Sequence, residues 1–248
     1  ALERELLPAL GKLAAASDQK AREFSDVVKP GRTHLQDAVP VTLGQEFSGY
    51  ASMVEHGISR VRNASVSLRE LAIGGTAVGT GLNADPRFAE FAVAEINALT
   101  GLGFRRAENT FEALQGRDAA VEASGALRSV AVSLMKIAND LRLLSSGPRT
   151  GLAEIELPAL QPGSSIMPGK VNPVIPEAVC MVAAQVIGND VAITVAGQSG
   201  QLELNVMMPL IAYDLLQSIE LEANAAKALA EKCIEGTKAD EERCRRLA

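Results

Sequence analysis

Apolar side chains recur every three or four positions between residues 127 and 144, a spacing that a β-strand cannot place on one face. The residues concerned are Leu127, Val130, Leu134, Ile137, Leu141 and Leu144. An α-helix turns once in about 3.6 residues, so these side chains form a single stripe along one side of a long helix. Such a stripe has to be buried against other elements, and the pattern therefore predicts a helix that is packed among helices.

The same spacing recurs in four further stretches and sets the expected fold class. The predicted helices contain residues 6–13 (ending before Pro30), 47–61, 176–196 and 209–233. Between residues 86 and 115 we expect a short helix and loops, and strand alternation is confined to short runs such as residues 155–157. The chain is 47% hydrophobic but only 3% aromatic, which suits closely packed helices. These features predict an all-α long-helix bundle.

Charge and cysteine content exclude several classes of protein. A net charge of −6 and a pI of about 5.1 argue against nucleic-acid or membrane-surface partners, which favour a basic face. No apolar run approaches the ~20 residues that a membrane-spanning helix needs. Cys180, Cys233 and Cys244 are odd in number and widely spaced, which fits neither a disulfide framework nor a metal site. We therefore expect a reducing, cytoplasmic compartment.

Three polar loops separate the expected helices: residues 31–40, 74–86 and 163–173. Pockets in helix bundles form at helix ends, so function is to be sought in these loops. In the third loop, GSSIMPGKVNP, glycine and proline prevent a regular helix or strand. Its two glycines and Lys170 suggest a phosphate-binding loop, but the glycine spacing differs and Val171 replaces the expected hydroxyl residue.

The side chains of this third loop suit a carboxylate better. Lys170 supplies a positive charge, Asn172 a directional amide, and Ser164 and Ser165 supply hydroxyl groups. The helix expected after Pro173 would favour an anion near its N-terminus. On composition alone, however, an exposed loop with a chance lysine is the commoner explanation.

The chain contains two histidines, and they differ in context. His34 lies in the polar loop GRTHLQDA, where a group that titrates near neutral pH can serve as an acid or base. His56 lies in an expected helix and is interpreted as structural. Two histidines without a cysteine or carboxylate cluster at ligand spacing do not make a metal site.

Several of these motifs together resemble the fumarase/aspartase superfamily. GSSIMPGKVNP is similar to the superfamily signature, and GRTHLQDAVPVTLGQEFSGY is similar to a second conserved block. Further similar blocks are GGTAVGTGLN (74–83), SLMKIANDLRLLSSGPR (133–149) and GQLELNV (200–206). The blocks occur in the expected order, so the resemblance covers nearly the whole chain.

Within the superfamily, two branches share features with this chain. Residues 109–114, Gly169 and Glu203 resemble class II fumarases, whereas residues 174–177 and Gln201 resemble aspartases. The favoured interpretation is a fumarate hydratase, which interconverts (S)-malate and fumarate in the tricarboxylic acid cycle. The alternatives are an aspartate ammonia-lyase on the same scaffold and a non-catalytic tetramerisation core.

The resemblance implies a homotetramer whose active sites combine loops from three subunits, with no metal and no organic cofactor. It also implies a role for each residue of the expected site. The catalytic residues are Ser164 as the base, His34 for the departing water and Glu177 to orient His34; the substrate-binding residues are Thr33, Ser165, Lys170 and Asn172. Removal of a proton beside a carboxylate gives a dianionic aci-carboxylate, which these donors would stabilise.

The resemblance also implies how much of the enzyme is present. Residues 1–248 correspond to the central helical domain of the superfamily, without its N-terminal segment and its small C-terminal domain. Because the N-terminal segment supplies further substrate-binding loops, we expect this chain alone to be weakly active or inactive.

Overall fold

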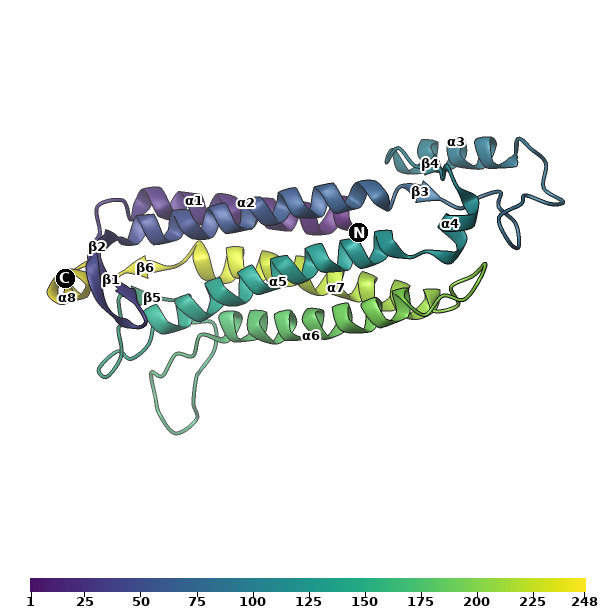
Figure 1. Ribbon diagram of the computed structural model, residues 1–248. Coiled ribbons are helices and arrows are strands. Elements are labelled where there is room, and N and C mark those ends of the chain that lie inside the picture. Colours follow the sequence, from purple (N-terminus) through teal and green to yellow (C-terminus); the bar gives the residue numbers. More distant parts are fainter. The chain divides into compact units, whose positions relative to one another are not determined.

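The computed structural model describes all residues from Ala1 to Ala248, and Figure 1 shows the order of its elements. The residues group into two compact units. Unit 1 comprises Ala1–Ile58, Ser129–Val186 and Ile219–Ala248, and unit 2 comprises Ser59–Arg128 and Ile187–Ser218. Both candidate catalytic loops belong to unit 1.

Long helices dominate the chain, as the apolar spacing predicted. They are α1 (Leu7–Glu23), α2 (Leu43–Ser67), α5 (Asp118–Leu144), α6 (Val174–Gly197) and α7 (Met208–Leu229). Short π-helical turns precede α1 (η1, Leu2–Leu6) and follow α7 (η2, Ala230–Ile234). The shorter helices are α3 (Phe88–Thr100), α4 (Thr110–Gln115) and α8 (Glu241–Leu247). The predicted all-α bundle is confirmed.

Local capping interactions explain where several helices begin. At the start of α2, the Thr42 hydroxyl accepts a hydrogen bond from the Gln45 backbone N–H, and the Gln45 side chain accepts one from the Thr42 N–H. This reciprocal capping box satisfies two amide groups that would otherwise lack partners. Asn109 caps α4 and Asp240 caps α8 in the same general way. In α6, Pro176 occupies the first turn, where no backbone donor is needed.

The predicted loop at residues 31–40 forms most of a β-hairpin, which corrects the sequence interpretation. Strand β1 (Val28–Thr33) pairs antiparallel with β2 (Gln36–Thr42). The alternation typical of strands is hidden by Pro30 and Gly31 in one strand and by Pro40 in the other. A register shift between Pro30 and Arg32 further breaks the period of two.

Two smaller pairs of strands complete the β-structure. In unit 1, β5 (Ile155–Glu156) pairs antiparallel with β6 (Lys238–Ala239), which confirms the short strand run expected near residue 155. In unit 2, β3 (Glu70–Leu71) pairs in parallel with β4 (Arg105–Arg106). These short pairs fix chain segments beyond the ends of helices without adding a sheet layer.

The predicted stripe of α5 is buried along its whole length. Each of the residues Leu127, Val130, Leu134, Ile137, Leu141 and Leu144 is at most 6% exposed. In unit 1, Phe24, Phe47 and Tyr50 add edge-to-face aromatic contacts with ring centroids 5.4 Å apart. In unit 2, Ile193, Ala196 and Ile211 form a smaller apolar cluster. Burial of these side chains is what holds the helices together.

Helix α6 differs from what the sequence analysis expected. By length and composition alone it is apolar enough to cross a membrane, so the expectation that no such run exists was wrong. Scattered Glu177, Asn189 and Asp190 conceal the run from a simple search for uninterrupted apolar residues. The core helix of a globular protein can pass the same test, and Asp190 is itself buried in an ion pair with Arg128 at 2.7 Å.

Glu222 on α7 is a charged residue type placed in the core of unit 1. Its side chain is 0% exposed, and neither carboxylate oxygen has a hydrogen-bond partner. Burial therefore raises the pKa of Glu222 well above its usual value, and the nearby backbone of Ala131 opposes this effect only in part. Burial of this carboxyl group therefore favours its neutral form.

This burial predicts a specific pH dependence of stability. The folded-state pKa of Glu222 lies above the unfolded one, so its stabilising contribution is complete below the unfolded pKa and is lost as the pH rises towards the folded pKa. Glu222→Gln should remove this loss. In urea unfolding between pH 5 and 8, the free energy of unfolding of the variant should rise relative to that of the wild type by up to about 1.4 kcal/mol per pH unit.

Glu220→Gln is the matched control, because Glu220 lies on the same helix but is exposed. Its unfolding free energy should follow that of the wild type at every pH. Parallel curves for Glu222→Gln and the wild type would show that Glu222 is not held neutral by burial.

Candidate active site

The hairpin of unit 1 presents His34 at a strained turn. Thr33 pairs with Gln36, which leaves His34 and Leu35 as the two turn residues, with φ angles of 56° and 58°. A two-residue turn with positive φ at both positions usually contains Asn and Gly, because larger side chains are strained there. All of the side chains from Thr33 to Gln36 are exposed. Strain of this kind is concentrated at functional sites, and in this turn two consecutive residues carry it.

Gly31 allows the hairpin to bend before it reaches this turn. A Cβ atom at this position would lie 2.7 Å from the Val39 carbonyl oxygen, so a larger residue would force the strands apart. The register shift between Pro30 and Arg32 falls at the same point. A bulge re-aims the residues that follow it, here Thr33 and His34.

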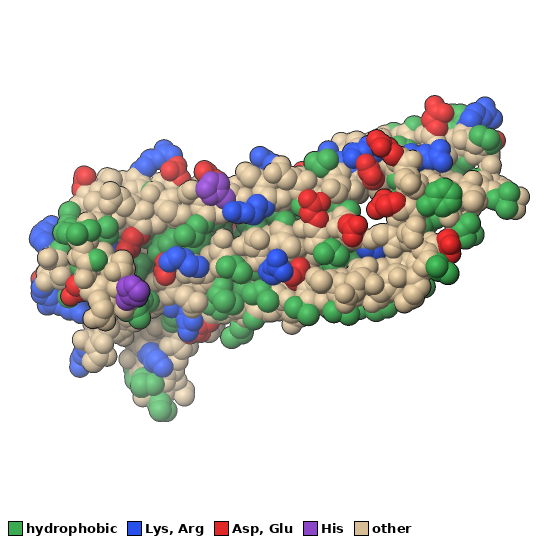
Figure 2. All heavy atoms as spheres, viewed as in Figure 1, with side chains coloured by type: hydrophobic (Ala, Val, Ile, Leu, Met, Phe, Trp, Pro, Cys, Tyr) green, Lys and Arg blue, Asp and Glu red, His purple; other side chains and the backbone are tan.

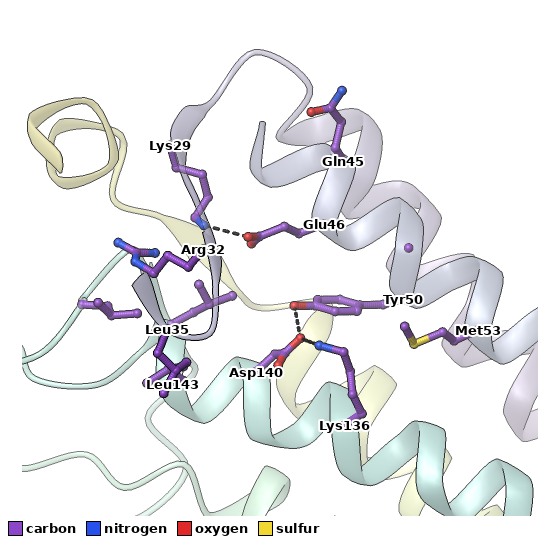
Figure 3. Close-up of a pocket in the computed structure, with 13 residues that line it drawn as sticks. Lys29, Arg32, Leu35, Gln45, Glu46, Tyr50, Met53, Lys136, Asp140 and Leu143 are labelled. Carbon is purple, nitrogen blue, oxygen red and sulfur yellow. Dashed lines mark hydrogen bonds and ion pairs between the residues drawn. The ribbon is translucent and has the colours of Figure 1, made fainter. Parts of the chain in front are cut away.

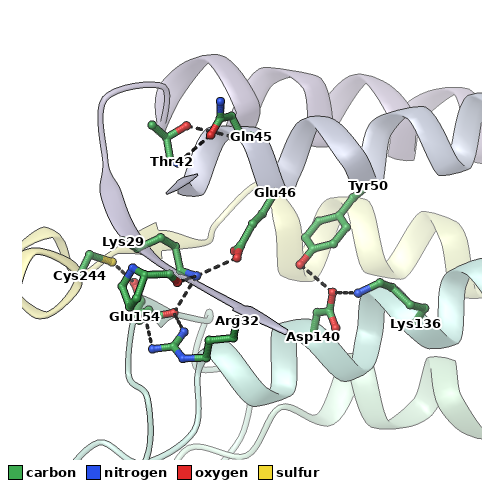
Figure 4. Close-up of polar contacts among 11 residues, drawn as sticks. Lys29, Arg32, Thr42, Gln45, Glu46, Tyr50, Lys136, Asp140, Glu154 and Cys244 are labelled. Atoms are coloured by element: carbon green, nitrogen blue, oxygen red, sulfur yellow. Dashed lines mark hydrogen bonds and ion pairs between the residues drawn. The ribbon is translucent and has the colours of Figure 1, made fainter. Parts of the chain in front are cut away.

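Behind the hairpin lies a cluster of buried charges (Figure 4). The Arg32 guanidinium donates two hydrogen bonds to the Glu154 carboxylate, at 3.1 and 2.8 Å. The Lys29 ammonium lies 3.2 Å from Glu154 and 2.7 Å from Glu46. Lys29 and Glu154 are 1% and 0% exposed, so their charges are compensated by each other and not by water.

These contacts shift the pKa values of the cluster. The hydrogen bond to Glu154 raises the pKa of Arg32, which stays positively charged. Burial raises the pKa of Glu46, although the hydrogen bond from Lys29 opposes this shift. The second carboxylate oxygen of Glu46 has no hydrogen-bond partner. Both carboxylate oxygens of Glu154 therefore have cationic partners, whereas only one carboxylate oxygen of Glu46 has a partner.

A cavity of about 320 Å³ opens beside this cluster (Figure 3). On its other side, the Tyr50 hydroxyl donates a 3.0 Å hydrogen bond to Asp140, and Lys136 forms an ion pair with the same carboxylate. Burial raises the pKa of Tyr50, so it remains a hydrogen-bond donor. Each cation that lines the cavity is already paired with a carboxylate, so the cavity offers no spare positive charge for an anion.

The second candidate element, the loop at residues 163–173, projects from the helices of unit 1 between β5 and α6 (Figure 1). The loop is closed at its base, where the Gly163 N–H donates to the Lys170 carbonyl at 2.9 Å. The Asn172 side-chain amide donates to the Gly163 carbonyl at 3.1 Å. A Cβ atom at Gly163 would lie 2.3 Å from the Lys170 carbonyl oxygen, so closure in this form requires glycine.

The closed loop presents its polar groups in different ways. The Ser164 hydroxyl is partly buried and accepts a 3.3 Å hydrogen bond from the Ile166 N–H. Ser165 and Lys170 are exposed. Asn172, expected to bind substrate, already uses one amide hydrogen to close the loop. Ser164 is therefore the hydroxyl that the backbone orients.

The expected site residues fall into separate groups within one chain. Thr33 and His34 lie on the hairpin, Ser164 lies on the loop, and Glu177 lies in the first turn of α6. No hydrogen bond or ion pair joins His34 to Ser164 or to Glu177 within the chain. Their roles, and the predicted pairing of His34 with Glu177, stay predictions.

Sequence reasoning missed the charged cluster behind the hairpin. Arg32 lies in the motif around His34 but is given no role by the sequence, and neither Glu154 nor Lys29 is singled out by it. A signal was present, because Glu154 directly precedes the apolar Ile155 in the short strand run. A carboxylate at the edge of a buried strand needs a cationic partner, but its position in the sequence does not say which one.

Comparison with known proteins places this arrangement in a family. A lyase family profile matches residues 1–188, and the chain belongs to this lyase family. Among curated relatives, the chain is 61% identical over 244 residues to the class II fumarate hydratase of Mycobacterium tuberculosis, covering 98% of this chain and 52% of the relative. With the class II fumarate hydratase of Neisseria meningitidis it shares 59% identity over 235 residues, covering 95% and 51%.

Solved structures give the same result. The chain superposes on the class II fumarase of Schistosoma mansoni with a TM-score of 0.94 and 41% sequence identity, covering 98% of this chain and 54% of that one. The resemblance to class II fumarases inferred from the motifs is thereby confirmed. The chain spans about half the length of the relatives that it matches.

The geometry of the loop leads to a test of its closure. Gly163→Ala should break the contacts with Lys170 and Asn172, because the added methyl group cannot fit. Loss of two hydrogen bonds of about 1 kcal/mol each should open the loop about 30-fold more often. Tryptic cleavage after Lys170 should accelerate by a similar factor.

Gly11→Ala is the control, because Gly11 is exposed in α1 and a Cβ atom there meets nothing within 4 Å. This variant should be cleaved like the wild type and be more stable by about 0.5–1 kcal/mol. Equal cleavage of the Gly163→Ala variant and the wild type would contradict the proposed closure.

Proposed function

We propose that this chain provides the catalytic helical core of a fumarate hydratase, which interconverts (S)-malate and fumarate. The observation that carries the proposal is the closed loop at residues 163–173, which holds Ser164 and Lys170 in a chain that is 59–61% identical to class II fumarate hydratases. The same loop would serve an ammonia-lyase. The names of these relatives favour water over ammonia as the leaving group.

In this proposal, Ser164 removes the proton from the carbon beside a substrate carboxylate. A serine hydroxyl is a weak base unless its alkoxide is stabilised, and the Ile166 N–H at 3.3 Å and a nearby cation would do so. Lys170 and the second amide hydrogen of Asn172 would meet the negative charge that develops on the aci-carboxylate. Ser165 would bind the substrate.

The hairpin would act on the other end of the substrate. Thr33 would hold a carboxylate, and His34 would bind or activate the departing water. Because His34 and Glu177 make no contact within one chain, the pair that orients His34 would form between subunits. This requirement supports a homotetramer whose sites combine loops from different copies.

The surface of α6 supports such an assembly (Figure 2). Met181, Val191 and Val195 on this helix are 71%, 60% and 49% exposed. On α7, Tyr213 and Leu216 are 64% and 57% exposed. Large apolar side chains that are exposed on long helices are typical of faces that pack against other chains. A shared core of α6 and α7 helices from several copies would bury them.

The cysteines are consistent with a cytoplasmic location, which is part of the proposal. All three cysteines are free thiols. Burial raises the pKa of Cys233 to about 12 and that of Cys244 to about 11, so neither forms a reactive thiolate at neutral pH.

A chimera tests the proposed activity. The chain replaces the matching half of the M. tuberculosis fumarate hydratase, with which it aligns over 244 residues. Fumarate formation from L-malate and from L-aspartate is followed separately by ultraviolet absorbance. We expect turnover of malate by the chimera and much weaker or no turnover by the 248-residue chain alone. Ser164→Ala and His34→Gln should each lower kcat by about 10²- to 10⁴-fold, as expected for loss of a general base or acid.

Each result of the chimera assay has a defined meaning. Turnover of aspartate alone would replace the hydratase by an ammonia-lyase. A folded chimera that is inactive with both substrates would overturn the proposal of a catalytic core.

The assembly is tested by light scattering coupled to size-exclusion chromatography at micromolar concentration. A particle of four 26.0-kDa chains is expected. Met181→Lys should shift it towards smaller species, because a charge would have to be buried. Leu99→Lys, which alters a 75% exposed residue on α3, should leave the assembly unchanged. A monomeric wild-type chain would contradict the proposed tetramer.

A further inference from the structure

We propose that Glu154 is a positioning residue: through Arg32 it holds the strained turn that presents Thr33 and His34. The inference rests on the proposed function for its kinetic consequence, but not for its structural one. It adds to the expected site a buried carboxylate that acts through Arg32.

The contact between Glu154 and Arg32 is a bidentate ion pair, which we call the Arg32–Glu154 joint. Two parallel hydrogen bonds, at 3.1 and 2.8 Å, connect the guanidinium to the carboxylate. A bidentate pair fixes orientation as well as distance, which a single hydrogen bond does not. Glu154 is 0% exposed and Arg32 is 14% exposed, so water competes little for either group.

Glu154 is itself held firmly by its backbone. Its N–H donates to the Leu144 carbonyl at the end of α5 at 2.9 Å. Its carbonyl accepts a hydrogen bond from the N–H of Asp240, the cap of α8, at 3.0 Å, and the Cys244 thiol lies 3.5 Å from the same oxygen. The carboxylate that receives Arg32 therefore projects from a point fixed to two helices.

The tip of the turn has few restraints of its own: the Thr33–Gln36 strand pair and one hydrogen bond of 3.3 Å from the Gln36 side-chain amide to the Leu35 carbonyl. The side chains of Thr33, His34 and Leu35 are exposed, and Leu35 is 71% exposed. Positive φ at His34 and Leu35 costs about 1–2 kcal/mol per residue, and such strain persists only where surrounding contacts over-determine the conformation. Arg32, immediately before Thr33, is the last residue of β1 that is anchored in the interior.

Charge balance makes Glu154 the critical carboxylate of the cluster. Lys29 and Arg32 both lie against it, and only Lys29 has a second carboxylate partner, Glu46. Without the charge of Glu154, Arg32 would lose its only ion pair, whereas Lys29 would keep one with Glu46. Loss of Glu46 would leave the Arg32–Glu154 joint intact.

The structural test uses the imidazole NMR signals of the 248-residue chain, which has two histidines, assigned with His56→Gln. In Glu154→Gln and in the milder Arg32→Lys, the His34 signals should shift and broaden while those of His56 stay in place. Glu46→Gln, which spares the joint, should leave His34 unchanged. Asp190→Asn, which removes the charge of a buried carboxylate paired with Arg128 in unit 2, controls for general loss of stability.

The kinetic test uses the same variants in the active chimera, at a temperature at which each is fully folded. Displacement of Thr33 and His34 should raise the KM for malate and lower kcat, with kcat/KM reduced about 10- to 100-fold, the order expected for a misplacement near 1 Å. A merely structural role would lower the active fraction and leave KM unchanged. Glu46→Gln and Asp190→Asn should keep the wild-type KM.

The NMR test and the kinetic test distinguish failure of the positioning role from failure of the proposed function. If the chimera turns over no substrate, the proposed function fails, and the NMR spectra still decide the positioning role. Unchanged His34 signals in folded Glu154→Gln and Arg32→Lys would overturn the inference. So would an equal change of the His34 signals in Asp190→Asn.

Discussion

Burial of the apolar stripe on α5 is the interaction on which the rest of the structure depends. Every residue of the stripe is at most 6% exposed, and loss of one buried leucine or isoleucine side chain costs roughly 2–5 kcal/mol. Two such losses would equal much of the net stability of a whole domain, about 5–15 kcal/mol. The stripe therefore fixes the long helices, and the loops at their ends are free to carry residues that contribute nothing to the core. The chemistry of the candidate site lies in those loops.

The charged cluster behind the hairpin fixes the position of the hairpin relative to the helices of unit 1. A buried ion pair is a weak source of stability, because removing two charges from water offsets most of their attraction. It is a good source of specificity, because only one arrangement satisfies a bidentate guanidinium and carboxylate. Lys29, Arg32 and Glu154 thus define where the strained turn stands, while the helices supply the free energy that keeps it folded.

The sequence predicted what depends on periodicity and missed what depends on pairing. The helices and the α5 stripe were predicted correctly, since local spacing determines them. The hairpin was interpreted as a loop, because Pro30, Gly31 and a register shift remove the alternation of a strand. Glu154 could not be assigned, since its partner Arg32 lies 122 residues away in the chain. The candidate residues of the loop and the hairpin were singled out by their side-chain chemistry and given roles by family resemblance, and neither carries information on how they are held.

The separation of the expected site residues within one chain explains why such internal supports matter. In the proposed assembly, His34 and Ser164 meet partners on other copies, and those contacts form only after the chain has folded. An element that has to match a partner loses less entropy on association when its conformation is already fixed. Gly163 and Asn172 close one loop, and Glu154 and Arg32 restrain the other, entirely within the chain. In the proposed assembly, the chain would therefore contribute loops whose conformations are already restrained within the chain.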